Sequence, residues 1–105
     1  MTQLEAAHSI EKLTDQLVNK YHPDKIILFG SGAQDLEEVN DIDFFIVKND
    51  VLHFGAERIQ QLYRLVVSDA PVDYIVYRPS EVAERLSMGD PFVTGIFKEG
   101  KVLYG

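Results

Sequence analysis

The chain contains no cysteine, and its longest uninterrupted apolar runs, such as residues 26–29 and 44–47, are only four residues long. The absence of cysteine excludes disulfide bonds, zinc ribbons and thiol catalysis. A run of four is far shorter than the ~20 apolar residues that span a bilayer. The N-terminus also lacks the basic and then apolar order of a signal peptide. We therefore expect a soluble, cytoplasmic protein.

Basic residues are scarce as well, because ten Lys and Arg stand against seventeen Asp and Glu, which gives a net charge of −7. A surface this acidic does not hold nucleic acid or anionic lipid by bulk attraction. Any phosphate must then be held locally, by backbone amides, a metal ion or a few placed cations. The 105 residues show no repeat and no linker rich in Pro or in Gly and Ser. We therefore expect one domain over residues 1–105.

The spacing of apolar residues predicts a long helix over the first twenty residues. Thr2 and Glu5 have the spacing of a capping box at its start. Apolar residues then recur every three or four positions, which predicts one buried face. These residues are Leu4, Ala7, Ile10, Leu13, Leu17 and Tyr21. The helix should end before Pro23, because proline disfavours helical dihedrals in the residue before it.

The rest of the chain alternates between strand and helix patterns. Short runs rich in β-branched and aromatic residues predict strands at 25–29, 41–47, 72–77 and 101–104. Helical patterns lie at 53–69, 79–86 and 91–99, and one or two helical turns are expected at 31–36, before a polar loop at 37–40. The helix 53–69 is expected to bury Phe54, Ile59, Leu62, Tyr63 and Val66. The predicted fold class is α/β (α+β), with a small mixed sheet flanked by helices.

Connection lengths bring three aspartates together at one end of this sheet. Only eleven residues separate the first two strands, which favours antiparallel pairing over a parallel crossover. The helix before the third strand favours a parallel crossover there. Asp41, Asp43 and Asp73 would then lie at the same sheet edge, near Gly30 and Ser31.

This arrangement predicts a metal site. The pair Asp41 and Asp43 alone, about 6.7 Å apart along a strand, is better explained as a solvated strand start. Three acids at one edge are different, because two carboxylates about 5 Å apart repel by about 3 kcal/mol at an effective dielectric of roughly 20. A cation relieves that repulsion. Gly30 allows a close backbone approach, and Ser31 offers amides and a hydroxyl to an anion, which together suit a metal-bound triphosphate.

The order of these motifs resembles the nucleotidyltransferase signature of the DNA polymerase β superfamily. It comprises an apolar strand, Gly30-Ser31, about ten residues, Asp41-x-Asp43, and then Asp73 at the start of a later strand. The closing segment, residues 96–104, is similar to the usual end of the family. The small size resembles the minimal nucleotidyltransferases, and the resemblance implies the nucleotidyltransferase fold.

The resemblance also implies roles for these residues. Gly30 and Ser31 would hold the nucleotide phosphates, Asp41 and Asp43 would bind two magnesium ions, and Asp73 would complete the second metal site and help to activate the attacking hydroxyl. The implied reaction is in-line attack on the α-phosphate of ATP with release of pyrophosphate. The implied acceptor is a tyrosine of a HEPN-domain toxin, for which this protein would be the antitoxin.

One departure from the family pattern keeps a second function open. Where relatives commonly carry arginine, residues 32–40 contain three acids and no base. A non-catalytic antitoxin or binding module that retains the fold is therefore the alternative. An antibiotic nucleotidyltransferase fits less well, since 105 residues leave no room for a drug-binding domain. The sequence leaves the acceptor, the preferred base and a possible homo-oligomer open.

Several other residues are assigned ordinary structural or surface roles instead of chemistry. The histidines fit no metal-ligand spacing, the aromatics are expected in the core, and the cations and loop acids are expected on the surface. They are His8, His22 and His53, Phe92, Phe97 and Tyr77, Arg78, Lys98 and Lys101, and Glu37 and Glu38.

Overall fold

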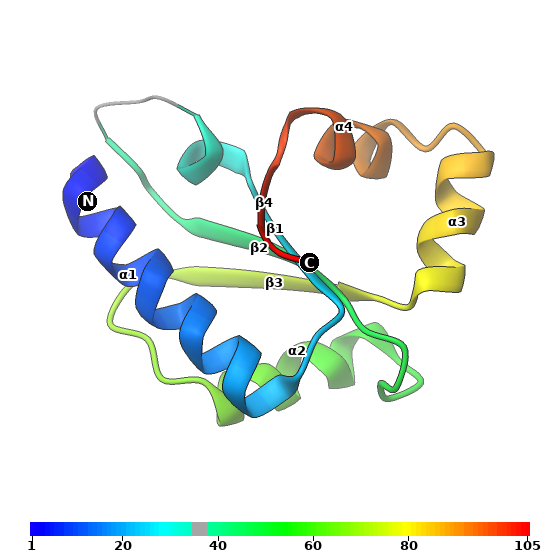
Figure 1. Cartoon of the computed structure of the whole chain (residues 1–105), viewed down its shortest axis with the longest axis horizontal. Coiled ribbons are helices and arrows are strands. Elements are labelled where there is room, and N and C mark those ends of the chain that lie inside the picture. The colour runs from blue at the N-terminus through cyan, green and yellow to red at the C-terminus, as the bar shows by residue number, and fades with distance from the viewer. Residues whose placement is uncertain (35–37) are drawn as a thin grey trace.

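A four-stranded mixed sheet separates two pairs of helices in the computed structural model, which describes residues 1–34 and 38–105 (Figure 1). The strands are β1 (Lys25–Phe29), β2 (Ile42–Val47), β3 (Val72–Tyr77) and β4 (Lys101–Tyr104), in the order β3-β2-β1-β4. β1 pairs antiparallel with both β2 and β4, and β2 pairs parallel with β3. The predicted fold class and both predicted strand directions are confirmed.

One face of the sheet is covered by α1 (Gln3–Gln16), the π-helical turn η1 (Leu17–Tyr21) and α2 (Gly55–Leu65). The other face is covered by α3 (Pro79–Ser87) and α4 (Pro91–Glu99) (Figure 1). Neighbouring strand residues belong to opposite cores, since Phe44 packs in the cluster with α1 and α2 while Phe45 packs in the cluster with α3 and α4. This is the two-residue alternation of a strand buried on both faces.

The first helix begins as predicted but buries a different row of residues. The Glu5 amide donates to Thr2 Oγ1 at 3.2 Å and the Thr2 amide donates to Glu5 Oε1 at 2.9 Å, so the capping box is confirmed. The expected burial of Leu4 and Ala7 is wrong: both are exposed, Leu4 by 82%. The buried row instead starts at Ala6 and continues at the same helical spacing through the partly buried Ile10 and the buried Leu13, Leu17 and Tyr21, which leaves Leu4 and Ala7 off that row.

The helical segment widens into η1 at Leu17 and ends at Tyr21, and His22 then adopts a left-handed conformation with φ 56°. This conformation ends the helix before Pro23, as expected.

The second long helix is shorter than predicted. It spans Gly55–Leu65 instead of 53–69, because Phe54 and Val66 already have extended backbones and cap its two ends. Phe54 is 63% exposed and Tyr63 49% exposed, so the expectation that both lie on the buried face is wrong. Arg58 takes a buried position on this helix instead and is only 2% exposed.

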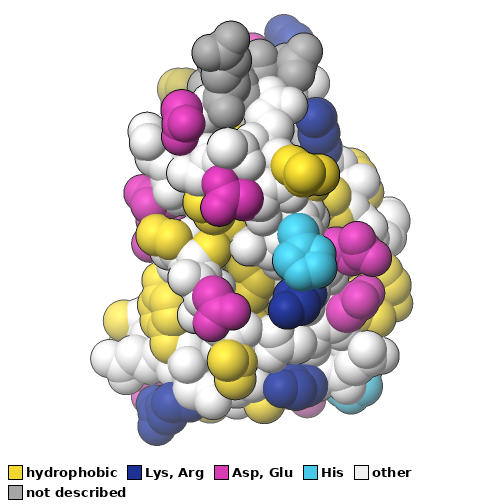
Figure 2. Space-filling model, turned by 90° about the vertical axis from the view of Figure 1, so that its left-hand side faces the viewer, with side chains coloured by type: hydrophobic (Ala, Val, Ile, Leu, Met, Phe, Trp, Pro, Cys, Tyr) yellow, Lys and Arg dark blue, Asp and Glu magenta, His cyan; other side chains and the backbone are white. Residues whose placement is uncertain are grey.

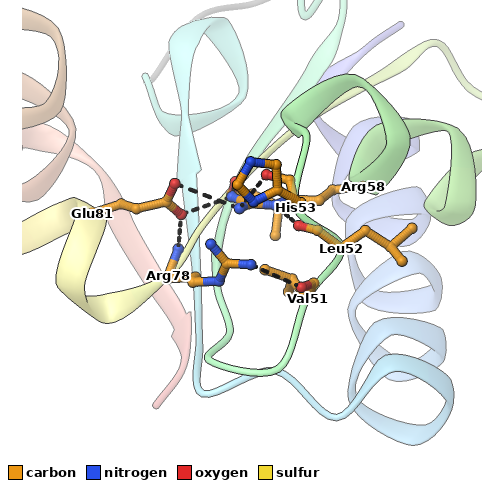
Figure 3. A network of polar contacts seen from close by, with 7 residues as sticks. Val51, Leu52, His53, Arg58, Arg78 and Glu81 are labelled. Atoms are coloured by element: carbon orange, nitrogen blue, oxygen red, sulfur yellow. Dashed lines mark hydrogen bonds and ion pairs between the residues drawn. The ribbon is translucent and has the colours of Figure 1, made fainter.

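The buried guanidinium of Arg58 ties the end of β3 to the loop before α2 and to the start of α3 (Figure 3). It donates to the carbonyls of Leu52 at 2.6 Å, Val76 at 3.0 Å and His53 at 3.1 Å. It also donates to Glu81 Oε1 at 2.7 Å. These contacts satisfy a charge that would otherwise be costly to bury.

The predicted helical turn after β1 is present as a 3-10 helix, η2 (Gly30–Ala33). The later part of that prediction, and Glu37, fall on residues 35–37, outside the described residues. Two further expectations differ from the structure. The second strand begins at Ile42, one residue later than predicted. Phe92 and Phe97 are 49% and 37% exposed instead of core residues, although their rings form T-shaped contacts with Phe29 and Phe45 of the sheet, respectively. Within the described ranges, no helix is long and apolar enough to cross a membrane.

Candidate active site

The centre of the acidic edge is Asp43, which lies between a glycine turn and a second aspartate. In the strand register, Asp43 is paired with Phe29, the residue before Gly30, on one side and with Asp73 on the other. The parallel pairing of β2 with β3 is what places Asp43 and Asp73 side by side. Both acids project from the face that α3 and α4 cover, since Phe45 and Ile75, two residues further along each strand, belong to that core.

Gly30 makes room for the Asp43 carboxylate. Its φ is +69°, in the left-handed region that favours glycine, and a Cβ at this position would overlap Asp43 Oδ2. The next residue, Ser31, donates its hydroxyl hydrogen bond to the Asp41 carbonyl at 3.3 Å. Asp41 itself is exposed, just before β2 begins. The structure therefore brings all five predicted residues to one edge of the sheet.

The carboxyl group of Asp43 is electrostatically strained. The pKa of Asp43 is raised from 3.8 to about 6. Partial burial is the largest cause, and the charges of Asp73 and Asp41 and a hydrogen bond with Asp73 add to it. Like charges and desolvation both disfavour a carboxylate. The same features favour a bound cation, which would neutralise this repulsion.

Tyr63 also belongs to this site, which its place in the sequence did not indicate. Its hydroxyl donates to the Val72 carbonyl at 2.7 Å and lies 3.4 Å from Asp73 Oδ1. Its ring packs edge-on against Tyr74, with the ring centroids 5.2 Å apart. The helical spacing counted Tyr63 among the core residues, because an aromatic at that spacing is typical of a buried face. Only the packing of α2 beside the start of β3 shows its hydroxyl at the acidic edge.

Two cavities open beside the three acids. One of about 650 Å³ is lined by Asp41, Asp73, Tyr63 and Arg64. The other, of about 330 Å³, lies between η2 and α4 and is lined by Gly30 and Phe92 among others. Figure 2 shows this end of the molecule, where acidic side chains are spread over the face with apolar side chains exposed between them.

The donor chemistry of the edge fits magnesium, although the side chains do not already form a closed ligand set. In residues 1–34 and 38–105, no group of three His, Cys, Asp or Glu side chains is arranged to hold a metal ion. Magnesium prefers oxygen ligands and commonly keeps several waters, using one or two carboxylates together with substrate phosphates. Neighbouring carboxylates from Asp43 and Asp73, with the space that Gly30 leaves, match that requirement.

The remaining residues singled out in the sequence lie away from this edge or in surface positions. His8, His22 and His53 are exposed on α1, after η1 and before α2. Arg78 donates to the Val51 carbonyl at 3.1 Å, in the network at the opposite end of β3. Lys98 and Lys101 are exposed at the surface. Glu38 is also at the surface, and its carboxylate lies 3.4 Å from the N-terminal amine.

Comparison with known families agrees with this geometry. The profile of the family described as polymerase beta, nucleotidyltransferase, matches residues 11–105. The chain therefore belongs to this nucleotidyltransferase family, which confirms the resemblance to the polymerase β superfamily. Members of the family generally use a nucleoside triphosphate and a divalent metal ion. No curated protein and no solved structure matches the chain.

Proposed function

We propose that this protein is a magnesium-dependent nucleotidyltransferase that transfers AMP from ATP to a hydroxyl group of a partner protein. The observation that carries the proposal is the placement of Asp43 between Gly30 and Asp73, with Asp41 and Ser31 at the same edge. Family membership supports the same reaction class. The acceptor in this proposal is a tyrosine of a HEPN-domain toxin, and the protein acts as its antitoxin, as a single domain in the cytoplasm.

Each residue has a defined part in the proposed reaction. Asp41, Asp43 and Asp73 would hold the magnesium ions, which when bound stabilise the entering and leaving oxygens of the phosphoryl group. The turn at Gly30 and the hydroxyl of Ser31 would bind the phosphates that leave as pyrophosphate. Asp73, at the cavity it shares with Asp41, would accept the proton of the attacking hydroxyl.

The two cavities divide the edge into two sides. The one between η2 and α4 adjoins Gly30 and suits the nucleotide. The one lined by Asp41, Asp73 and Arg64 lies on the other side of the acids and suits the acceptor. Both are open at the surface, so a partner protein would supply the remaining wall of the acceptor side.

The test is transfer of a radiolabelled α-phosphate. The protein is mixed with labelled ATP, magnesium and the product of the adjacent gene, and the label on that partner is measured. We expect labelling by the wild-type protein and none by Asp43→Asn, with Asp50→Asn as a matched control because Asp50 is exposed beyond the opposite end of β2. Absence of label, under conditions where the two proteins bind each other, overturns the proposed reaction.

The second candidate is a non-catalytic antitoxin that neutralises its partner by contact. It is favoured by the absence of basic residues at positions 32–40 and by the open arrangement of the acids in the described part of the chain. The double variant Asp41→Asn, Asp43→Asn separates the two functions. Neutralisation that survives this change supports contact alone, whereas loss of neutralisation with an intact complex supports chemistry.

A further inference from the structure

The hydroxyl of Tyr63 lies beside the proposed reaction centre, although nothing in the proposed function needs a tyrosine of this chain there. Its oxygen is 3.4 Å from Asp73 Oδ1, and the side chain is 49% exposed. It also lines the 650 Å³ cavity together with Asp41 and Asp73. The hydroxyl therefore lies beside Asp73, and the side chain is open to a ligand in a cavity that Asp41 also lines.

The surroundings of Tyr63 hold its ring while leaving the hydroxyl able to change partner. The ring packs edge-on against Tyr74 at an angle of 64° between the ring planes. The phenol has one proton, which is donated to the Val72 carbonyl at 2.7 Å. Rotation about the C–O bond turns this proton toward Asp73 without moving the ring. The geometry thus presents a fixed oxygen nucleophile next to a carboxylate acceptor.

The other tyrosines of the chain lack this placement. Tyr21 and Tyr74 are buried, and within the described residues their hydroxyl groups have no hydrogen-bond partner. Tyr77 lies at the far end of β3, and Tyr104 lies on β4, the strand at the opposite edge of the sheet from β3. Among the tyrosines of residues 1–34 and 38–105, only Tyr63 has its hydroxyl within hydrogen-bond distance of one of the three carboxylates.

We propose that Tyr63 is a site of self-modification, at which the protein attaches a nucleoside monophosphate to its own phenolic oxygen. The proposal rests on the transferase activity proposed above and uses a nucleoside triphosphate as co-substrate. The Tyr63 oxygen forms a bond to the α-phosphorus, and the bond from that phosphorus to the oxygen that bridges to the β-phosphate breaks. Pyrophosphate leaves with that electron pair. The phenolic proton passes to Asp73 and then to water, and the product is a tyrosyl phosphodiester.

The same geometry limits the modification to one nucleotide. Once attached, the nucleotide fills the cavity that Tyr63 shares with Asp41 and Asp73, and it adds a negative charge beside two carboxylates. A second acceptor could not then approach the acids. We therefore expect one nucleotide per chain.

The test is the mass of the purified full-length protein after incubation with ATP and magnesium, followed by peptide mapping. We expect the added mass of one AMP, located on Tyr63. The modification should be lost in Tyr63→Phe, which keeps the ring that packs on Tyr74, and in Asp43→Asn. Tyr104→Phe is the matched control, because Tyr104 is similarly exposed (42%) on the strand farthest from β3, and it should be modified like the wild type.

Thermal stabilisation by magnesium and ATP, and release of pyrophosphate, are measured on the same samples. If the nucleotide binds or pyrophosphate is released while Tyr63 stays unmodified, self-modification is overturned and the proposed function stands. Modification of a different residue also overturns it. If the protein shows neither stabilisation nor pyrophosphate release, alone or with its partner, the proposed function fails and this inference fails with it.

Discussion

Asp43 and Asp73 are direct register partners on two parallel strands, β2 and β3. Adjacent strands lie about 4.8 Å apart, and like charges directly opposite each other destabilise a sheet. The fold therefore holds two acids together at a cost in stability. Such a cost is typical of a site whose charges are neutralised by a ligand, and it can be measured without any activity assay.

Replacement of Asp43 by asparagine should stabilise the metal-free protein. The substitution removes the charge that Asp73 and Asp41 repel. After allowance for solvent screening, we expect a gain of about 1 kcal/mol in the free energy of unfolding near neutral pH. Urea unfolding in EDTA measures it, with Asp50→Asn as the control. Magnesium should stabilise the wild type and leave Asp43→Asn unchanged, and an equal effect of magnesium on both proteins would contradict the assignment.

The same charge makes stability depend on pH. Burial, together with the charges of Asp73 and Asp41, raises the pKa of Asp43 to about 6 in the folded protein, from an ordinary value of 3.8. The folded state thus binds the proton more tightly than the unfolded state. Protonation of Asp43 therefore stabilises the folded state. This stabilisation is complete below about pH 3.8 and is lost as the pH rises through about 6.

The pH effect is measured by denaturation of the metal-free protein between pH 4 and pH 8. The difference in unfolding free energy between Asp43→Asn and the wild type should grow over this range and reach about 1 kcal/mol. A constant difference would show that Asp43 titrates with an ordinary pKa.

Much of the fold could be predicted because local signals and chain connectivity agreed. Residues that interrupt helices or strands, such as Pro23, Gly30 and Gly100, follow the ends of their elements at the positions expected from sequence. The short link between β1 and β2 and the helix between β2 and β3 fixed their relative directions. Strand direction alone was enough to place the starts of β2 and β3, and hence the three aspartates, at the same edge.

The residues that were missed depend on how the elements pack. The sequence pattern of α2 did not distinguish Arg58, which is buried, from the exposed charged residues. It also placed Tyr63 on the buried face, although this residue is exposed. Burial of Arg58 requires carbonyls from three separate positions, Leu52, His53 and Val76. When two rows of apolar residues overlap on a long helix, helical spacing also does not show which row is buried. Leu4 was for this reason assigned to the buried face, although it is exposed.

Removal of the Tyr74 hydroxyl should be neutral or stabilising. This group is buried and, among the described residues, has no hydrogen-bond partner, and burial raises the pKa of Tyr74 to about 12. Tyr74→Phe removes an unsatisfied polar atom, for which we expect a gain of up to about 1 kcal/mol. Tyr63→Phe instead loses the bond to Val72 and should cost about 1 kcal/mol. Urea midpoints compare the two, and a large loss of stability in Tyr74→Phe would show a missing partner.

The Arg58 network should dominate stability at the end of the sheet opposite the acids. Arg58→Met removes a charge that is 2% exposed and leaves its backbone carbonyl acceptors and Glu81 without that donor. We expect a loss of about 3 kcal/mol or more. Arg85→Met is the control, since Arg85 is 50% exposed in its ion pair with Asp90 and should lose less than about 1 kcal/mol. Equal urea midpoints for the two variants would contradict this role.

Substitution of Gly30 should damage both stability and the site, because its backbone conformation and its lack of a side chain are both used. Gly30→Ala puts a Cβ where the Asp43 carboxylate lies, at a φ of +69°. We expect a loss of about 1–3 kcal/mol.

Magnesium-dependent stabilisation should also disappear in Gly30→Ala, since the Asp43 carboxylate must move. Gly55→Ala is the matched control, at the start of α2 and outside the lining of both cavities. No atom lies within 4 Å of its added Cβ, and its φ is not left-handed. That control should keep its stability or gain up to about 1 kcal/mol, because alanine favours a helix, and should leave binding unchanged. Calorimetric titration with magnesium and ATP measures both variants, and wild-type binding by Gly30→Ala would show that the turn at Gly30 does not shape the site.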